Sequence, residues 1–196
     1  MSDTEMDRVR ELLREHAGVA DAYRPRRRAE ERLLTAWERK YGVAMPDEYR
    51  AFLRQLGNGG TMPGPYCDFV LLPLAEVQGG PHATTPFPIS AERLATRYRQ
   101  LAAEGRPADG VLFPELEPYW EQYDRPPGCV TFGQYPSSDA LFLVTAGELR
   151  GTVWSGVCFG TPEVKADKPL SFLAWLADAL DELLHGEFGP APSSGG

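Results

Sequence analysis

The sequence predicts an α+β domain, in which a mostly antiparallel sheet of about four to six strands is flanked by N-terminal helices and a C-terminal helix. Three observations predict this class. Apolar residues recur at helical spacing early in the chain, short apolar runs follow one another closely between residues 129 and 155, and a broad apolar helical stripe comes near the end. Strands and helices do not alternate, so a parallel sheet of strand–helix–strand units is not expected.

Three helices are expected before the first strand. They cover residues 4–16, residues 29–41 and a segment that begins at Pro46. Proline is favoured at the first position of a helix, and the two acidic residues that follow it suit the positive end of the helix dipole. The run Gly57-Asn58-Gly59-Gly60 ends the third helix, because these residues tolerate positive φ.

The remaining elements are separated by loops rich in glycine and proline, of which the chain contains 20 and 18. Long loops in compact domains are often functional or mobile. The expected elements are a strand at 66–74, a loop at 75–90, a helix at 91–103, a long irregular stretch at 105–127, strands from Cys129, at 141–144 and at 152–155, a loop at 159–168 and a helix that begins near Pro169.

Charge is distributed unevenly along the chain. The protein carries 20 basic and 28 acidic residues, a net charge of −8. Residues 107–196 contain 4 basic and 13 acidic residues, so the surplus lies in the second half. Nucleic acids and anionic membranes are bound by clustered Lys and Arg, so direct binding to either is not expected. Two interpretations remain: a solvated surface that keeps the protein soluble, and a surface that meets a basic partner.

The cysteines and the N-terminus indicate a cytoplasmic protein. Cys67, Cys129 and Cys158 are far apart and form no Cys-x-x-Cys pair, so we interpret them as buried thiols in a reducing compartment. Residues 1–15 alternate charges and lack the apolar centre of a secretory signal. No apolar run approaches the ~18 residues that a membrane-spanning helix needs.

The chain contains none of the common catalytic motifs. Ser155 does not stand in a Gly-x-Ser-x-Gly sequence, and the glycines at 57–60 are not followed by the Lys-Ser/Thr of a phosphate-binding loop. His16, His82 and His185 are interpreted as ordinary surface or capping residues. We therefore expect no enzymatic activity, no metal site and no cofactor. An enzyme with catalytic residues dispersed along the chain is the alternative.

An acidic aromatic stretch, residues 115–124, is the candidate partner-binding site. Tyr and Trp are favoured anchors at protein interfaces, and carboxylates speed the encounter with a basic partner. A nuclease binds phosphates with Lys and Arg, so an acidic partner would cover that surface by imitating the charge of nucleic acid. In the alternative interpretation the rings cover the edge of the core and the carboxylates are solvated. The candidate residues are Glu115, Glu117, Tyr119, Trp120, Glu121, Tyr123 and Asp124.

One basic run interrupts the first half of the chain. Residues 24–28, Arg-Pro-Arg-Arg-Arg, are interpreted as a hinge between the first two helices. Glu30 and Glu31 follow at once, and we expect them to neutralise the run. A contact with phosphate is the alternative.

Several segments follow one another in an order typical of a known family. They are Glu30-x6-Trp37-Glu38-x2-Tyr41-Gly42-x3-Pro46-x2-Tyr49-x2-Phe52-Leu53-x5-Gly59-Gly60, then Gly128-Cys129, Leu141-Phe142-Leu143-Val144, Gly151-Thr152-Val153-Trp154 and Phe172-Leu173-x-Trp175-Leu176-x6-Leu183-Leu184. Together they resemble the SUKH superfamily, which includes fungal regulators of cell-wall synthesis and many bacterial immunity proteins. The similarity covers roughly residues 27–186. The stretch 79–127 is longer than the family pattern, and residues 134–138 also depart from it.

The resemblance also suggests how the chain is divided. Residues 1–26 form an N-terminal helix and the basic hinge, and residues 27–186 form the SUKH-like domain with a long insertion around 79–127. Residues 187–196 are of low complexity and are expected to be a disordered tail.

The resemblance implies a protein-binding domain without catalysis. In bacteria such domains are commonly immunity proteins, so the implied partner is a basic toxin domain, a nuclease among the candidates, which the chain would neutralise by stoichiometric occlusion. Two other functions stay open. One is a cytosolic adaptor or scaffold that regulates an endogenous partner, and the other is a small-molecule sensor or enzyme that uses the long middle loops as a lid. The sequence makes no prediction of the oligomeric state.

Overall fold

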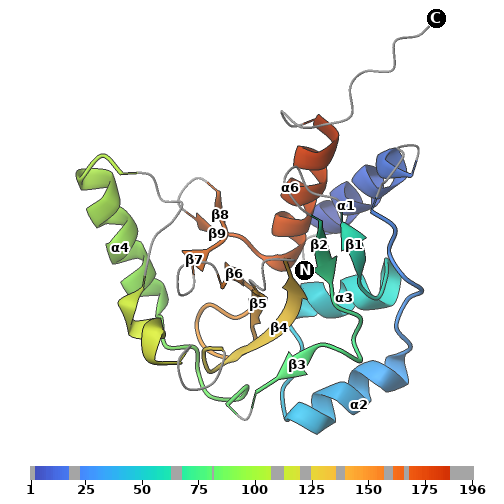
Figure 1. Ribbon diagram of the computed structural model, residues 1–196, viewed down its shortest axis with the longest axis horizontal. Coiled ribbons are helices and arrows are strands. Elements are labelled where there is room, and N and C mark those ends of the chain that lie inside the picture. Colours follow the sequence, from blue (N-terminus) through green and yellow to red (C-terminus); the bar gives the residue numbers. More distant parts are fainter. Residues whose placement is uncertain are drawn as a thin grey trace, which may run out of the picture.

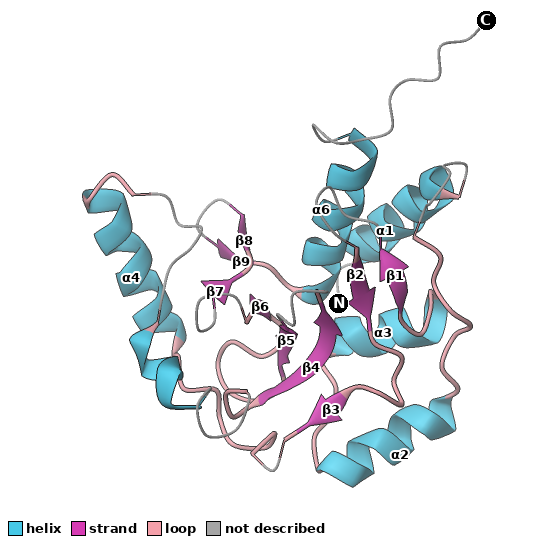
Figure 2. Cartoon of the chain, viewed as in Figure 1, coloured by secondary structure: helices cyan, strands magenta, loops and turns pink. Residues whose placement is uncertain are grey.

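The structure is a computed structural model that places one sheet between two groups of helices (Figures 1 and 2). It describes residues 3–17, 23–62, 68–80, 82–106, 113–119, 125–135, 140–156, 161–165 and 168–185. The helices are α1 (Asp3–His16), α2 (Glu31–Tyr41), α3 (Asp47–Gln55), α4 (Ala91–Ala103), the 3-10 helix η1 (Pro114–Leu116) and α6 (Phe172–His185). None of the described helices is long and apolar enough to cross a membrane. The strands are β1 (Gly60–Met62), β2 (Phe69–Leu71), β3 (Gln78–Gly79), β4 (Cys129–Gln134), β5 (Ala140–Val144), β6 (Val153–Ser155), β7 (Thr161–Pro162), β8 (Val164–Lys165) and β9 (Lys168–Pro169).

An antiparallel sheet organises the fold. Its strands lie in the order β1-β2-β4-β5-β6-β7, and β3 also pairs with β4. Because β2 and β3 use the same edge of β4, they pair with different parts of it: Val70 lies opposite Gln134, whereas Gln78 lies opposite Thr131. A separate two-stranded ribbon joins β8 to β9. The α+β class is confirmed, and two-residue strands enlarge the sheet to seven strands.

The central strands are buried on both faces. In β5, Leu141 and Leu143 face one core while Phe142 and Val144 face another, as expected for side chains that alternate along a strand. The first core lies between the sheet and α1, α2, α3 and α6; its largest side chains include Trp37, Tyr49, Phe52, Phe132, Phe172 and Trp175. The second core lies between the sheet and α4 with η1; its members are Phe87, Ile89, Leu94, Tyr98, Leu101, Phe113, Leu116, Cys129, Phe142, Val144, Leu149 and Trp154.

Helix α1 packs against α6, at the edge of the first core (Figure 1). Its apolar stripe ends at His16, which is 2% exposed, and the ring Nε2 lies 3.1 Å from the carbonyl oxygen of Leu180 in α6. The expectation that His16 is a surface or capping residue is therefore wrong. His16 lies seven residues after the buried Val9, two helical turns along the same face, so α6 covers both.

Five short strands lie where the sequence predicts loops or a helix end. β1 begins inside the glycine run that follows α3, β3 lies in the loop at 75–90, and β7, β8 and β9 lie between residues 161 and 169. Each contains two or three residues, too few to show the alternation that identifies a strand. The closing helix begins at Phe172 and not near Pro169, because the residues before it pair as β9.

Candidate functional site

The start of the acidic aromatic stretch is held firmly against α4. Phe113 and Leu116 are buried in the second core. On the outer side, Arg93 of α4 donates from Nε to Oε1 of Glu115 at 2.7 Å. The hydroxyl of Ser90 accepts the backbone N–H of Arg93 at 3.1 Å and so caps the first turn of α4. The two buried anchors therefore fix the position of η1, and the ion pair lies on its outer side.

Glu115 is consequently a paired carboxylate. Desolvation raises its pKa, but hydrogen bonds from its own backbone amide and from Arg93 outweigh that effect, and the pKa lies below its ordinary value. The two side chains are 44% and 40% exposed, so solvent screens the pair and it adds little to stability. A basic partner must compete with Arg93 for this carboxylate.

The described remainder of the stretch contains one exposed acid and one half-buried ring. Glu117 is exposed, and Tyr119 packs against the second core. The half-burial of Tyr119 matches the interpretation in which aromatic rings cover the edge of the core. Four candidates lie outside the described residues: Trp120, Glu121, Tyr123 and Asp124.

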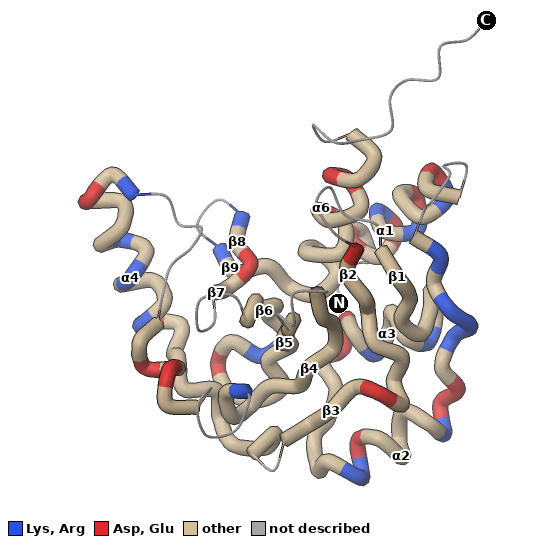
Figure 3. The backbone as a smooth tube through the Cα atoms, in the orientation of Figure 1, with Lys and Arg blue, Asp and Glu red and all other residues tan. Residues whose placement is uncertain are grey.

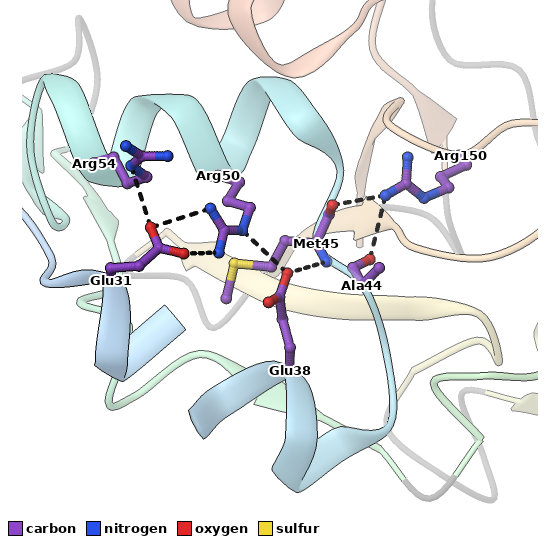
Figure 4. Close-up of polar contacts among 7 residues, drawn as sticks. All are labelled: Glu31, Glu38, Ala44, Met45, Arg50, Arg54 and Arg150. Atoms are coloured by element: carbon purple, nitrogen blue, oxygen red, sulfur yellow. Dashed lines mark hydrogen bonds and ion pairs between the residues drawn. The ribbon is translucent and has the colours of Figure 1, made fainter. Parts of the chain in front are cut away.

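A polar network joins α2 to α3 (Figure 4). Arg50 of α3 lies between two carboxylates of α2, donating from Nε to Oε1 of Glu38 at 3.3 Å and from its terminal nitrogens to Glu31. Arg54, one turn further along α3, also pairs with Glu31 at 3.3 Å. The hydrogen bonds from Arg50 hold the pKa of Glu31 below its ordinary value.

The network also fixes the turn between the two helices. Oε1 of Glu38 accepts the backbone N–H of Met45 at 3.1 Å, and Nη2 of Arg150 donates to the carbonyl oxygen of Met45 at 2.6 Å. Arg150 comes from the connection between β5 and β6, so the sheet and the helix pair are tied together (Figure 4). Sequence reasoning missed this contact because its partners are 105 residues apart and no local pattern links them.

Replacing Glu38 with Ala is expected to lower the free energy of unfolding by about 1–2 kcal/mol, because the N–H of Met45 and the guanidinium of Arg50 lose a partner. Urea unfolding measures the change. Arg39→Ala is the matched control, since Arg39 is exposed on the same helix, and it is expected to change stability by less than about 0.5 kcal/mol. Equal effects of the two substitutions would show that the network does not stabilise the turn.

The acidic surplus of the second half is partly neutralised by the N-terminal helix. Arg8 of α1 lies 3.3 Å from Asp178 and 3.6 Å from Asp181 in α6, and Lys165 lies 2.8 Å from Asp178. Glu148 accepts the first backbone N–H of α4 at 2.9 Å. Several of the counted carboxylates therefore have partners within the fold and are not an open acidic surface.

The buried thiol of Cys129 is not activated as a nucleophile. The thiol of Cys129 donates to the carbonyl oxygen of Pro126 at 2.9 Å, and burial raises the pKa of this thiol, which keeps it protonated. The expectation of a buried thiol is confirmed at Cys129; Cys67 and Cys158 lie outside the described residues. In the part of the chain that the structure describes, no group of three or more His, Cys, Asp and Glu residues is placed to hold a metal ion.

A protein-family model matches most of this architecture. The model of the SMI1/KNR4 family (SUKH-1) covers residues 28–185, which confirms the resemblance read from the sequence segments. The matched region begins just before α2 and ends with α6, so it contains the sheet, both cores and the α2–α3 network, and it leaves out α1. None of the curated proteins compared with this chain matches it.

Proposed function

Because the chain belongs to the SMI1/KNR4 family (SUKH-1), we propose that it acts by binding another protein and catalyses no reaction. The partner we propose is a bacterial toxin with a basic surface, a nuclease being the class that best fits an acidic ligand. The chain would neutralise it in the cytoplasm by covering that surface one-to-one. The observation that carries the proposal is the family match, which spans the helix pair, the sheet and the closing helix.

The proposed contact surface is the acidic aromatic stretch. Its beginning is pre-organised, because Phe113 and Leu116 are buried and the helix they anchor does not need to fold on binding. Glu117 is exposed, and Glu115 already accepts charge-assisted hydrogen bonds from an arginine of the same chain. An arginine of a basic partner would be accepted in the same way.

Replacing Trp120 or Tyr123 with Ala is expected to weaken partner binding by about 2 kcal/mol or more each, the loss typical of an aromatic anchor. Isothermal titration calorimetry gives the affinity, and a thermal melt of each variant gives its stability. We expect unchanged melting temperatures. Leu33→Ala serves as the control, because Leu33 is an exposed apolar side chain of α2, 47% exposed, and its loss should change neither quantity. Lower melting temperatures with intact affinity would place the two rings in the core instead.

The experiment that tests the function begins with capture of partners by the tagged full chain from cells that produce it. Captured proteins are identified by mass spectrometry, and the complex is rebuilt from purified components. A single basic toxin at a one-to-one ratio supports the proposal. Several housekeeping proteins would favour an adaptor, and no protein partner together with thermal stabilisation by a metabolite would favour a sensor.

A further inference from the structure

Four arginines line an open pocket of about 360 Å³ between α1, the basic run at 24–28 and the end of α3. Arg10 and Arg14 come from α1, Arg28 from the basic run and Arg54 from α3. We call this the arginine pocket. No carboxylate of the described residues lines it. Figure 3 shows the basic run at the edge of the molecule, on the segment that leads to α2.

Two of these arginines already have partners. Nη1 of Arg10 lies 2.6 Å from Oδ1 of Asp7, and its Nη2 donates to the side-chain oxygen of Gln55 at 2.5 Å. Arg54 lies 3.3 Å from Glu31, a carboxylate that also accepts from another arginine of α3. Part of their charge is therefore already compensated within the fold.

The other two arginines, Arg14 and Arg28, are exposed and have no ion pair or side-chain hydrogen bond within the described residues. The expectation that Glu30 and Glu31 neutralise the basic run is wrong. Glu30 lies 2.7 Å from Arg32, and Glu31 is used by the arginines of α3. Both carboxylates pair with arginines that come later in the chain, so the charge of Arg28 stays available to a ligand.

The basic run is a fixed part of the fold. The backbone N–H of Ala29 donates to the carbonyl oxygen of Leu53 at 2.8 Å, and that of Arg26 donates to Gly59 at 3.0 Å. A Cβ at Gly57 would lie 2.2 Å from the Cβ of Pro25, so only glycine fits at position 57. The basic run therefore packs directly against the segment that follows α3. Arg28 is thus placed beside α3 before a ligand arrives, which lowers the cost of binding.

We propose that the arginine pocket binds a small molecule that carries two or more phosphate groups. Guanidinium groups bind phosphate through paired, charge-assisted hydrogen bonds, and unpaired arginines facing one pocket favour a polyanion. The volume is that of a small-molecule site. Leu13 and Leu56 also line the pocket and offer apolar contact to the organic part of the ligand. A net charge of −8 disfavours a nucleic acid strand as the occupant. This inference does not depend on the proposed function.

Calorimetric titration of the full chain with inorganic pyrophosphate at constant ionic strength tests the proposal. We expect saturable binding at one site. Replacing Arg14 and Arg28 together with Ala should weaken it at least about tenfold, because the loss of even one charge-assisted hydrogen bond accounts for about a factor of ten. The double variant should unfold at the same temperature as the original protein, since both side chains are exposed.

The matched control replaces Arg39 and Arg99 together with Ala. Both are exposed, neither lines the arginine pocket, and the change in net charge is the same. We expect less than about a twofold loss of pyrophosphate affinity in this variant. Equal losses in the two double variants would overturn the proposal by showing general charge attraction. Absence of saturable binding, or binding to vesicles containing phosphoinositides but not to pyrophosphate, would also overturn it.

Discussion

Replacing Phe172 with Ala is expected to lower the free energy of unfolding by about 3–5 kcal/mol. The ring is fully buried at the start of α6 and lies 4.8 Å from Tyr49, 5.2 Å from Phe52 and 5.5 Å from Phe132, measured between ring centroids. These partners belong to α3 and β4, so one side chain joins the closing helix to both the helix pair and the sheet. Removing it leaves a cavity that three elements would have to close.

Urea unfolding followed by tryptophan fluorescence measures this loss. Phe172→Leu keeps part of the volume and should cost about 1–2 kcal/mol. Leu33→Ala, at an exposed position of α2, should cost less than about 0.5 kcal/mol. If Phe172→Ala were no more destabilising than Leu33→Ala, the aromatic centre of the first core would not be packed as described.

Replacing Gly128 with Ala is expected to cost about 3 kcal/mol or more, for two reasons that add. Its φ of 70° is strained for any residue with a Cβ, and that Cβ would lie 2.5 Å from the carbonyl oxygen of Thr85 and 2.6 Å from the backbone nitrogen of Phe87. Both obstacles are backbone atoms, which cannot rotate away. Gly128 also donates to the carbonyl oxygen of His82 at 2.9 Å, so its displacement disturbs the loop that precedes α4.

Gly105 provides a matched control for this prediction. Its φ is 66°, nearly that of Gly128, but a Cβ at Gly105 would meet no atom within 4 Å. Gly105→Ala should therefore cost only about 1–2 kcal/mol, the strain of the backbone alone. Thermal and urea unfolding of both variants give the comparison. Equal losses of stability in the two variants would mean that the backbone at 85–87 does not lie close enough to Gly128 to clash with a Cβ.

The long elements were predictable because each contains enough residues for its apolar side chains to show a recognisable spacing. Residues 91–103 carry apolar residues at helical spacing behind a capping serine, and α4 has the same limits. The run 141–144 was predicted as a strand from its apolar residues alone, and it is β5 within one residue. What the sequence did not reveal is that these four residues face two different cores, since that depends on what covers each side of the sheet.

The contacts between distant segments were not predictable. Arg150 donates a hydrogen bond to the carbonyl oxygen of Met45, and Arg93 donates one to Glu115. No local spacing in the sequence indicates either contact. The expectation that Glu31 neutralises the basic run is wrong for the same reason: Glu31 pairs with Arg50 of α3 and not with the arginines close to it in sequence. Composition identified the acidic aromatic stretch, but only the fold shows that its first carboxylate already has a partner.

The most direct test of the central claim is to titrate a fixed amount of the captured toxin with this chain and to measure the remaining toxin activity. Neutralisation by occlusion predicts a linear loss of activity that ends at one equivalent of the chain, at toxin concentrations well above the dissociation constant. A catalyst that modifies the toxin would inactivate it at far less than one equivalent and at a rate that depends on time. Complete inactivation at substoichiometric amounts would therefore contradict the account.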